Sequence, residues 1–171
     1  MSQCHEIARE KNISAQLEVI SNFEERQRSR WQAKTTCEKP LAWFLPRGYL
    51  MADGDLLRAE DGTLIRVIAA QEPVSEINSE QTQLLMRAAY HLGNRHVPLQ
   101  IGLHFLRYQP DHVLDAMVEG LGLQVIRTDK PFHPENGAYH AHSHDRPLRP
   151  PAHAPLQLSK DIGIFKAGNE Q

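Results

Sequence analysis

Short apolar or alternating runs, broken by turn residues, fill the chain from Leu17 to Ala70. This pattern is typical of a small β domain. Residues 41–45 predict a buried strand that ends at Pro46. The Asp61-Gly62 pair separates two apolar runs and predicts a hairpin in which both turn positions have positive φ. We therefore expect residues 1–72 to form an amino-terminal all-β domain, and we assign no catalysis to it.

The stretch RQRSRWQAK, residues 26–34, alternates basic side chains with other residues. As a strand it would carry most of its charge on one face and Trp31 on the other, because successive side chains point to opposite faces. Two interpretations stay open: a solvated strand face, or an edge that docks a peptide or a partner.

Near Pro73 the apolar period changes from that of a strand to that of a helix, so we expect the domain junction at residues 71–74. Asn78 is expected to cap a helix, with Gln81 three positions further on. An apolar stripe follows, and Gly93 is expected to end this helix.

The pattern then predicts strands at residues 97–101 and 105–108, a second helix capped by Asp111, and a last strand at residues 123–127. With a first strand at residues 74–77, the order is β-α-β-β-α-β, the ferredoxin-like arrangement. The predicted fold class is therefore α+β, with residues 73–139 as a ferredoxin-like domain.

After Asp129, prolines and histidines are frequent and apolar periodicity is weak. Such a segment buries too little surface to offset the entropy lost on ordering it. We expect residues 140–171 to form a flexible, histidine-containing tail.

Composition excludes several classes of partner. The 171 residues carry a formal net charge of −2, which favours neither nucleic acid nor an anionic membrane. No apolar run approaches the roughly 18 residues that a membrane span requires, and the start is too polar for a signal peptide, so we expect a cytoplasmic protein. Cys4 and Cys37 are expected to be unpaired thiols, although Cys4 next to His5 is a candidate for adventitious metal capture.

Histidines occur in three separate contexts. His96 follows a helix-ending Gly-Asn-Arg, and His112 opens the second predicted helix, where the helix dipole favours neutral imidazole. His140, His142 and His144 alternate, so an extended segment places the three rings on one side. Because imidazole is the commonest protein ligand for exchangeable transition metals, we interpret the chain as a metal carrier with these residues as candidate ligands. The alternative is a structural role for His96 and a solvent-facing position for His112.

Three stretches resemble the carboxyl-terminal half of the UreE family, the urease accessory nickel chaperones. They are AYHLGNRHVPLQI (89–101), LRYQPDHVLDAMVEGLGLQV (106–125) and KPFHPENGAYHAHSHD (130–145). Upstream, LPRG (45–48) and GDLLRAEDGTLIRVIAAQEPVSEI (54–77) resemble the end of that family's amino-terminal domain.

The resemblance implies a ferredoxin-like domain and a homodimer, in which two copies of His96 approach across a twofold axis and hold one Ni²⁺ between them. It also implies delivery of nickel to the urease apoprotein, in complex with the urease accessory GTPase. Imidazole ligation suits Cu²⁺ and Zn²⁺ as well, and these ions are expected to substitute in vitro; only the resemblance selects nickel. Since metal capture requires neutral rings, binding is expected to weaken below about pH 6.5.

Two other classes of function compete with a carrier. A metallohydrolase needs three protein ligands, an open coordination position and a carboxylate base, and the sequence has no His-Glu-x-x-His or comparable cluster. We therefore expect no enzyme. The alternative that stays open is a metal-independent scaffold or peptide-binding module based on the amino-terminal β domain.

Overall fold

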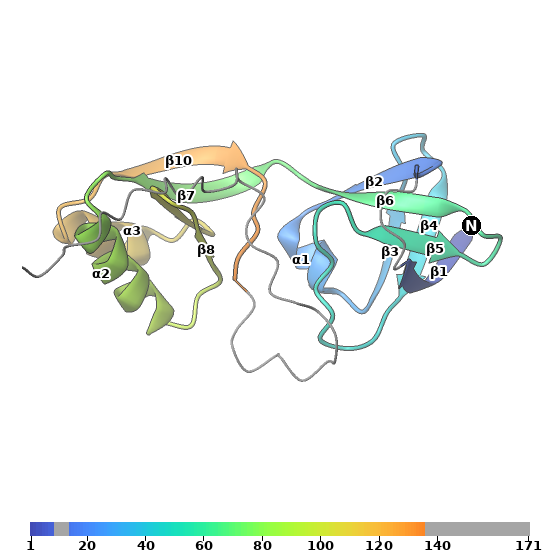
Figure 1. The fold of residues 1–171 in the computed structure, drawn as a ribbon, viewed down its shortest axis with the longest axis horizontal. Coiled ribbons are helices and arrows are strands. Elements are labelled where there is room, and N and C mark those ends of the chain that lie inside the picture. Colours follow the sequence, from blue (N-terminus) through green and yellow to red (C-terminus); the bar gives the residue numbers. More distant parts are fainter. Residues whose placement is uncertain (9–13, 136–171) are drawn as a thin grey trace, which may run out of the picture.

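The computed structural model describes residues 1–8 and 14–135, which form two units joined near residue 72 (Figure 1). The first unit contains β1 (Ser2–Ala8), β2 (Leu17–Ser21), α1 (Phe23–Gln27), β3 (Arg30–Lys34), β4 (Pro40–Phe44), β5 (Leu56–Ala59) and β6 (Leu64–Ala69). Its strands form one sheet in the order β2-β6-β5-β1-β4-β3. β1 pairs with β4 and β2 with β6 in parallel, and the other pairs are antiparallel.

The core of this unit contains Trp43, Met51 and Ile65, all fully buried. The buried strand predicted before Pro46 is confirmed as β4, whose central residues Leu41, Ala42 and Trp43 are buried.

The predicted hairpin is confirmed as the antiparallel β5–β6 pair. Only one of its two turn positions has positive φ, however. Gly62 has φ of +84°, whereas Asp61 is not among the described residues with positive φ. Asp61 instead accepts a hydrogen bond from the backbone N–H of Thr63 on its carboxylate, at 2.9 Å, and this bond fixes the turn without left-handed backbone at position 61.

The prediction of one strand across residues 26–34 is wrong in its first part. Residues 23–27 form α1, and only Arg30–Lys34 is a strand. The helix starts at a capping box: the side chain of Asn22 accepts from the N–H of Glu25, and the carboxylate of Glu25 accepts from the N–H of Asn22. Arg26 is therefore helical and buried rather than displayed on a strand face.

The second unit contains β7 (Glu72–Asn78), α2 (Thr82–Gly93), β8 (Leu99–Ile101), β9 (Phe105–Tyr108), α3 (His112–Gly120) and β10 (Val125–Lys130). The predicted order of elements, β-α-β-β-α-β, is the order observed. The four strands form an antiparallel sheet in the order β10-β7-β9-β8, and both helices lie on one side of it (Figure 1). The shared core contains Ile77 from the sheet, Leu92 from α2 and Val118 from α3.

The two predicted helix starts differ in outcome. Asp111 is confirmed as the cap of α3, because its carboxylate accepts hydrogen bonds from the N–H groups of Val113 and Leu114. The prediction for Asn78 is wrong: this residue lies in β7, paired with Phe105 of β9. The N-cap of α2 is Gln81, whose side chain makes no capping hydrogen bond.

A small apolar cluster joins the two units. Phe23 of α1 packs edge-to-face on Phe132, with ring centroids 5.1 Å apart, and Val74 of β7 completes the cluster. The N–H of Phe23 also donates to the carboxylate of Glu72, at 2.8 Å.

The side chain of Arg26 lies beside this cluster and is 1% exposed. Its Nη1 donates to the carbonyl of Met51 at 3.1 Å, and its Nη2 donates to the carbonyl of Phe132 at 2.5 Å. One buried guanidinium thus ties the first unit to the chain segment that follows the last strand of the second.

None of the described helices combines the length and the apolar character that crossing a bilayer demands.

Candidate functional site

His96 lies in the turn that links α2 to β8. The N–H of Arg95 donates to the carbonyl of Leu92, and the N–H of His96 donates to the carbonyl of Gly93, each at 3.0 Å. These bonds close the helix end and hold His96 in left-handed backbone, with φ of 56°. Histidine is one of the few non-glycine types enriched in that region. The side chain is exposed, so the turn presents an imidazole to the surface rather than to the core.

Large apolar side chains are exposed in the same part of the chain. Met86 and Tyr90 lie four residues apart on α2, so they share one face of that helix, and Tyr90 is 66% exposed. Ile101 ends β8, and Leu103 follows it at 75% exposure. A helix face and a strand end on the two sides of the His96 turn therefore leave apolar surface uncovered in the single chain.

His112 is the first residue of α3 and is also exposed. The start of α3 is capped by the side chain of Asp111, not by the imidazole of His112. Among residues 1–8 and 14–135, no three histidine, cysteine, aspartate or glutamate side chains are grouped so that they could hold a metal ion. Within this part of the chain, His96 and His112 are thus not brought into one closed metal site.

The predicted ligands His140, His142 and His144 lie outside the described residues. The segment that precedes them is described as far as Glu135. The N–H of His133 donates to the side chain of Gln100 at 3.1 Å, and the N–H of Glu135 donates to the carbonyl of Leu99 at 2.8 Å. The last described residues therefore run beside β8, the strand that follows the His96 turn.

Cys4 is not available to metal, contrary to the suggestion from its neighbour His5. The thiol lies in the core of the first unit and is fully buried, and this burial, reinforced by the nearby charge of Asp61, raises its pKa to about 12. His5 itself stacks on Phe44, and its Nε2 lies 3.1 Å from a carboxylate oxygen of Glu60. Cys4 and the exposed Cys37 are both unpaired, as predicted.

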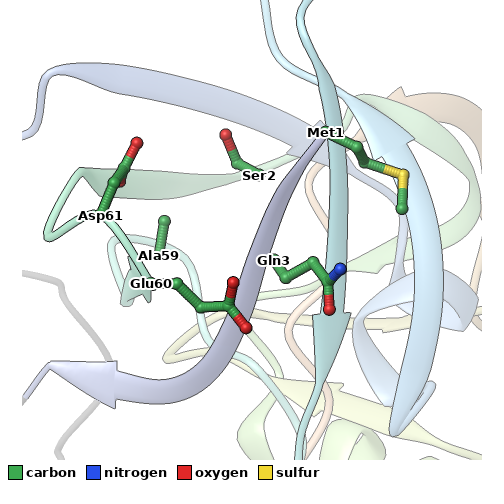
Figure 2. A pocket seen from close by; sticks show the side chains of 6 residues that line it. All are labelled: Met1, Ser2, Gln3, Ala59, Glu60 and Asp61. Atoms are coloured by element: carbon green, nitrogen blue, oxygen red, sulfur yellow. The ribbon is translucent and has the colours of Figure 1, made fainter.

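In the described part of the chain, two hollows of the first unit stand out, and neither is lined by His96 or His112. One, of about 250 Å³, is lined by Met1, Ser2, Gln3, Ala59, Glu60 and Asp61 (Figure 2). Its two carboxylates come from the turn after β5, and no histidine lines it, so its lining matches neither a nickel site nor the predicted set. The other, of about 430 Å³, is lined by Arg30, Trp31, Gln32 and Phe44 on strands β3 and β4.

A polar network in the second unit, in which Tyr108 and Asp115 are buried and Arg127 is exposed, was not anticipated from sequence. The hydroxyl of Tyr108 donates to Asp115 at 2.8 Å, and Nη2 of Arg127 donates to the other carboxylate oxygen, also at 2.8 Å. Burial by itself would raise the pKa of the Asp115 carboxyl, but the hydrogen bonds from Arg127 and Tyr108 outweigh it and hold that pKa below its ordinary value. The network ties β9, α3 and β10 together, and the hydroxyl of Tyr108 is engaged by Asp115.

Comparisons with known proteins match both units. Residues 2–70 match the family model of the UreE urease accessory protein, N-terminal domain, and residues 72–157 match that of the UreE urease accessory protein, C-terminal domain.

Several relatives carry the name urease accessory protein UreE. The protein from Teredinibacter turnerae is 56% identical over 122 residues, covering 71% of this chain and 79% of the relative. That from Saccharophagus degradans is 55% identical over 130 residues, covering 76% and 77%. That from Alkalilimnicola ehrlichii is 52% identical over 117 residues, covering 68% and 72%.

Proposed function

Because the chain belongs to the UreE family of urease accessory proteins, we propose that it binds nickel and delivers it to the urease apoprotein during maturation of the urease active site. Nickel is cargo here, not a resident cofactor. The observation that carries the proposal is His96, an exposed imidazole held in left-handed backbone by the end of α2.

The proposed site is shared between two copies of the chain. One imidazole alone binds a metal ion weakly, and the described part of one chain offers no grouped ligands. A twofold axis at the His96 turn would bring a second imidazole without a second residue in the sequence. The exposed apolar surface of Met86, Tyr90 and Leu103 supports this homodimer, because association would remove that surface from water.

The other predicted ligands have secondary roles in this proposal. His140, His142 and His144 would complete the coordination of the shared ion or hold one further ion, and the course of residues 133–135 beside β8 supports a tail that starts close to His96. His112, exposed at the start of α3, would be a separate and weaker site. Cu²⁺ and Zn²⁺ would compete in vitro, because the same ring nitrogens suit all three ions.

A carrier must release its cargo, so we expect a dissociation constant in the micromolar range, which corresponds to a binding free energy of about −8 kcal/mol. The apo protein should stay folded, because both cores are closed by apolar side chains that contain no proposed ligand. Loss of fold on treatment with a chelator would replace the carrier with a structural metal site.

The partners proposed are the urease apoprotein and the urease accessory GTPase, met in the cytoplasm. We further propose that residues 1–72 serve for docking, that residues 73–139 are the metal-binding domain, and that residues 140–171 are the histidine-containing tail. The order β10-β7-β9-β8 supports assignment of the second unit to the ferredoxin-like arrangement.

Equilibrium dialysis with Ni²⁺ tests the proposal on wild type, His96→Asn and His104→Ala. Asparagine removes the imidazole and still tolerates left-handed backbone, so the turn is kept. His104 is the matched control: it is half exposed, lies in the same unit and contacts Glu80. We expect His96→Asn to lose the tightest site and His104→Ala to keep it. Equal binding by all three proteins, or none by wild type, would favour the metal-independent scaffold.

A further inference from the structure

Strand β3 is an open edge of the six-stranded sheet. Among the strands of residues 1–8 and 14–135, it pairs only with β4. Two other sheet edges are partly covered: β2 accepts a hydrogen bond at Glu18 from the N–H of Thr36, and β8 accepts one at Leu99 from Glu135. The bond from Thr36 brings the chain after β3 onto β2, so the part of β3 that no other described segment covers is its first half.

In the first half of β3, some backbone N–H and C=O groups point away from β4. Ser29 accepts from Leu45, and Thr35 donates to Lys39, so in the β3–β4 ladder the odd-numbered positions bond to β4. Because hydrogen-bonded and non-hydrogen-bonded positions alternate in an antiparallel pair, the N–H and C=O groups of Arg30 and Gln32 face away from the sheet. Among the described residues, the N–H and C=O groups of Arg30 and Gln32 have no backbone hydrogen-bond partner on the outer side of β3.

An aromatic hollow lies at the same place. Arg30, Trp31, Gln32 and Phe44 line its volume of about 430 Å³. Trp31 and Phe44 are 37% and 38% exposed. The β3–β4 register puts Trp31 on the face of buried Trp43, and it puts Phe44 on the face of Arg30, where His5 stacks on one side of the ring. Free backbone groups beside exposed aromatic rings are the two elements of recognition by strand addition, in which the backbone supplies affinity and side-chain pockets supply specificity.

Charge indicates which segment fits. Lys34 is paired with Glu38 at 2.7 Å, and Arg28 is paired with Glu24. Within residues 1–8 and 14–135, Arg30 has no carboxylate at ion-pair distance. A second copy of β3 would set its own basic residues against these, which disfavours self-pairing. An acidic side chain opposite Arg30 is favoured instead.

We propose that the β3 edge binds an extended segment of a partner protein, in which acidic residues alternate with apolar ones. The segment adds as a strand next to β3, with its carboxylates on the side of Arg30 and its apolar side chains on the side of Trp31. This inference specifies the docking role proposed above for residues 1–72 and rests on it. The surface uses none of the proposed nickel ligands, so its occupancy does not require nickel.

The test uses the full chain and a fluorescein-labelled octapeptide of alternating valine and glutamate, followed by fluorescence anisotropy. We expect a dissociation constant on the order of 100 µM, and much weaker binding of the same peptide with lysine in place of glutamate. Reversal of the charge in Arg30→Glu replaces an attraction with a repulsion and should weaken binding about tenfold. The same reversal at exposed Arg87 of α2, Arg87→Glu, should leave binding unchanged.

A second variant, Gln32→Pro, separates strand addition from simple charge attraction. Proline at an outward edge position removes only the outward N–H and blocks approach of a new strand, leaving the β3–β4 bonds in place. It should abolish binding while the far-UV circular dichroism stays native. The proposal is wrong if acidic and basic peptides bind alike, or if Gln32→Pro binds as wild type does. It is also wrong if the Gln32 amide is protected from hydrogen exchange without peptide, because another segment or a second copy then occupies the edge.

Discussion

Replacement of Arg26 by methionine should destabilise the whole protein, because this side chain links the two units. Methionine keeps much of the length of the side chain but removes the guanidinium. The carbonyls of Met51 and Phe132 then lose their donors in a buried location. The apolar contacts of Phe23 and Phe132 with each other remain.

The magnitude follows from two opposing terms. A hydrogen bond from a charged donor contributes roughly 1.5–3 kcal/mol, and each carbonyl left without a partner costs about 1–3 kcal/mol. Burial of the cation costs free energy. It lowers the pKa of Arg26, and the negative charge of Glu72 offsets only part of this effect. Relief of that cost offsets part of the loss, so we expect a net decrease of about 3 kcal/mol in the free energy of unfolding.

The assay is urea denaturation followed by circular dichroism, with the thermal midpoint as a second readout. A loss of this size should lower the midpoint temperature by roughly 10 °C. Arg28→Met is the matched control, since Arg28 is half exposed and makes a surface ion pair with Glu24, and it should cost less than about 1 kcal/mol. If Arg26→Met cost no more than Arg28→Met, the two hydrogen bonds would not hold the units together and the reasoning would fail.

Three further predictions concern single features. In the native protein only Cys37 should react rapidly with a thiol reagent, with Cys4 reacting after unfolding; two equally fast thiols would contradict the burial of Cys4. Because the folded pKa of Asp115 is lowered, its stabilising contribution is complete above the ordinary aspartate pKa of about 4 and is lost as the pH falls through the folded value. Wild type should therefore lose more stability than Asp115→Asn between pH 6 and pH 3 in urea titrations, and parallel curves would count against it. Gly62→Ala should cost about 1 kcal/mol because φ is +84°, whereas Gly120→Ala at the end of α3 should not destabilise; equal midpoints would refute this.

Local signals predicted much of the second unit. Asp111 caps α3 because its carboxylate reaches N–H groups two and three residues away, an arrangement that the sequence alone specifies. Asn78 offers the same chemistry and yet lies in β7, because pairing with Phe105 extends the strand past it. Tertiary pairing overrode a local preference at that position.

The first unit shows why the rest was harder to predict. The capping box of Asn22 and Glu25 was readable, but the alternating basic residues after it favoured a strand prediction. The polar strand β1 has no strong pattern of its own and exists because it pairs with β4 and β5, far along the chain. The bond from Arg26 to Phe132 joins residues 106 positions apart, and no local pattern specifies it.

For the candidate site, the sequence indicated His96 as a ligand through a resemblance. The structure adds that the imidazole is exposed and that the backbone of His96 is left-handed. Exposed apolar residues lie close in sequence on both sides of it. A second donor supplied by symmetry is not a property of one chain, so neither the sequence nor one copy of the fold contains it.

The most direct test of the central claim is a crystal structure of the full chain grown with Ni²⁺, with the ion located by its anomalous scattering. We predict an anomalous peak on a twofold axis, within bonding distance of the His96 imidazoles of two protomers. Nickel bound elsewhere, with His96 free of metal in every copy, would contradict the account.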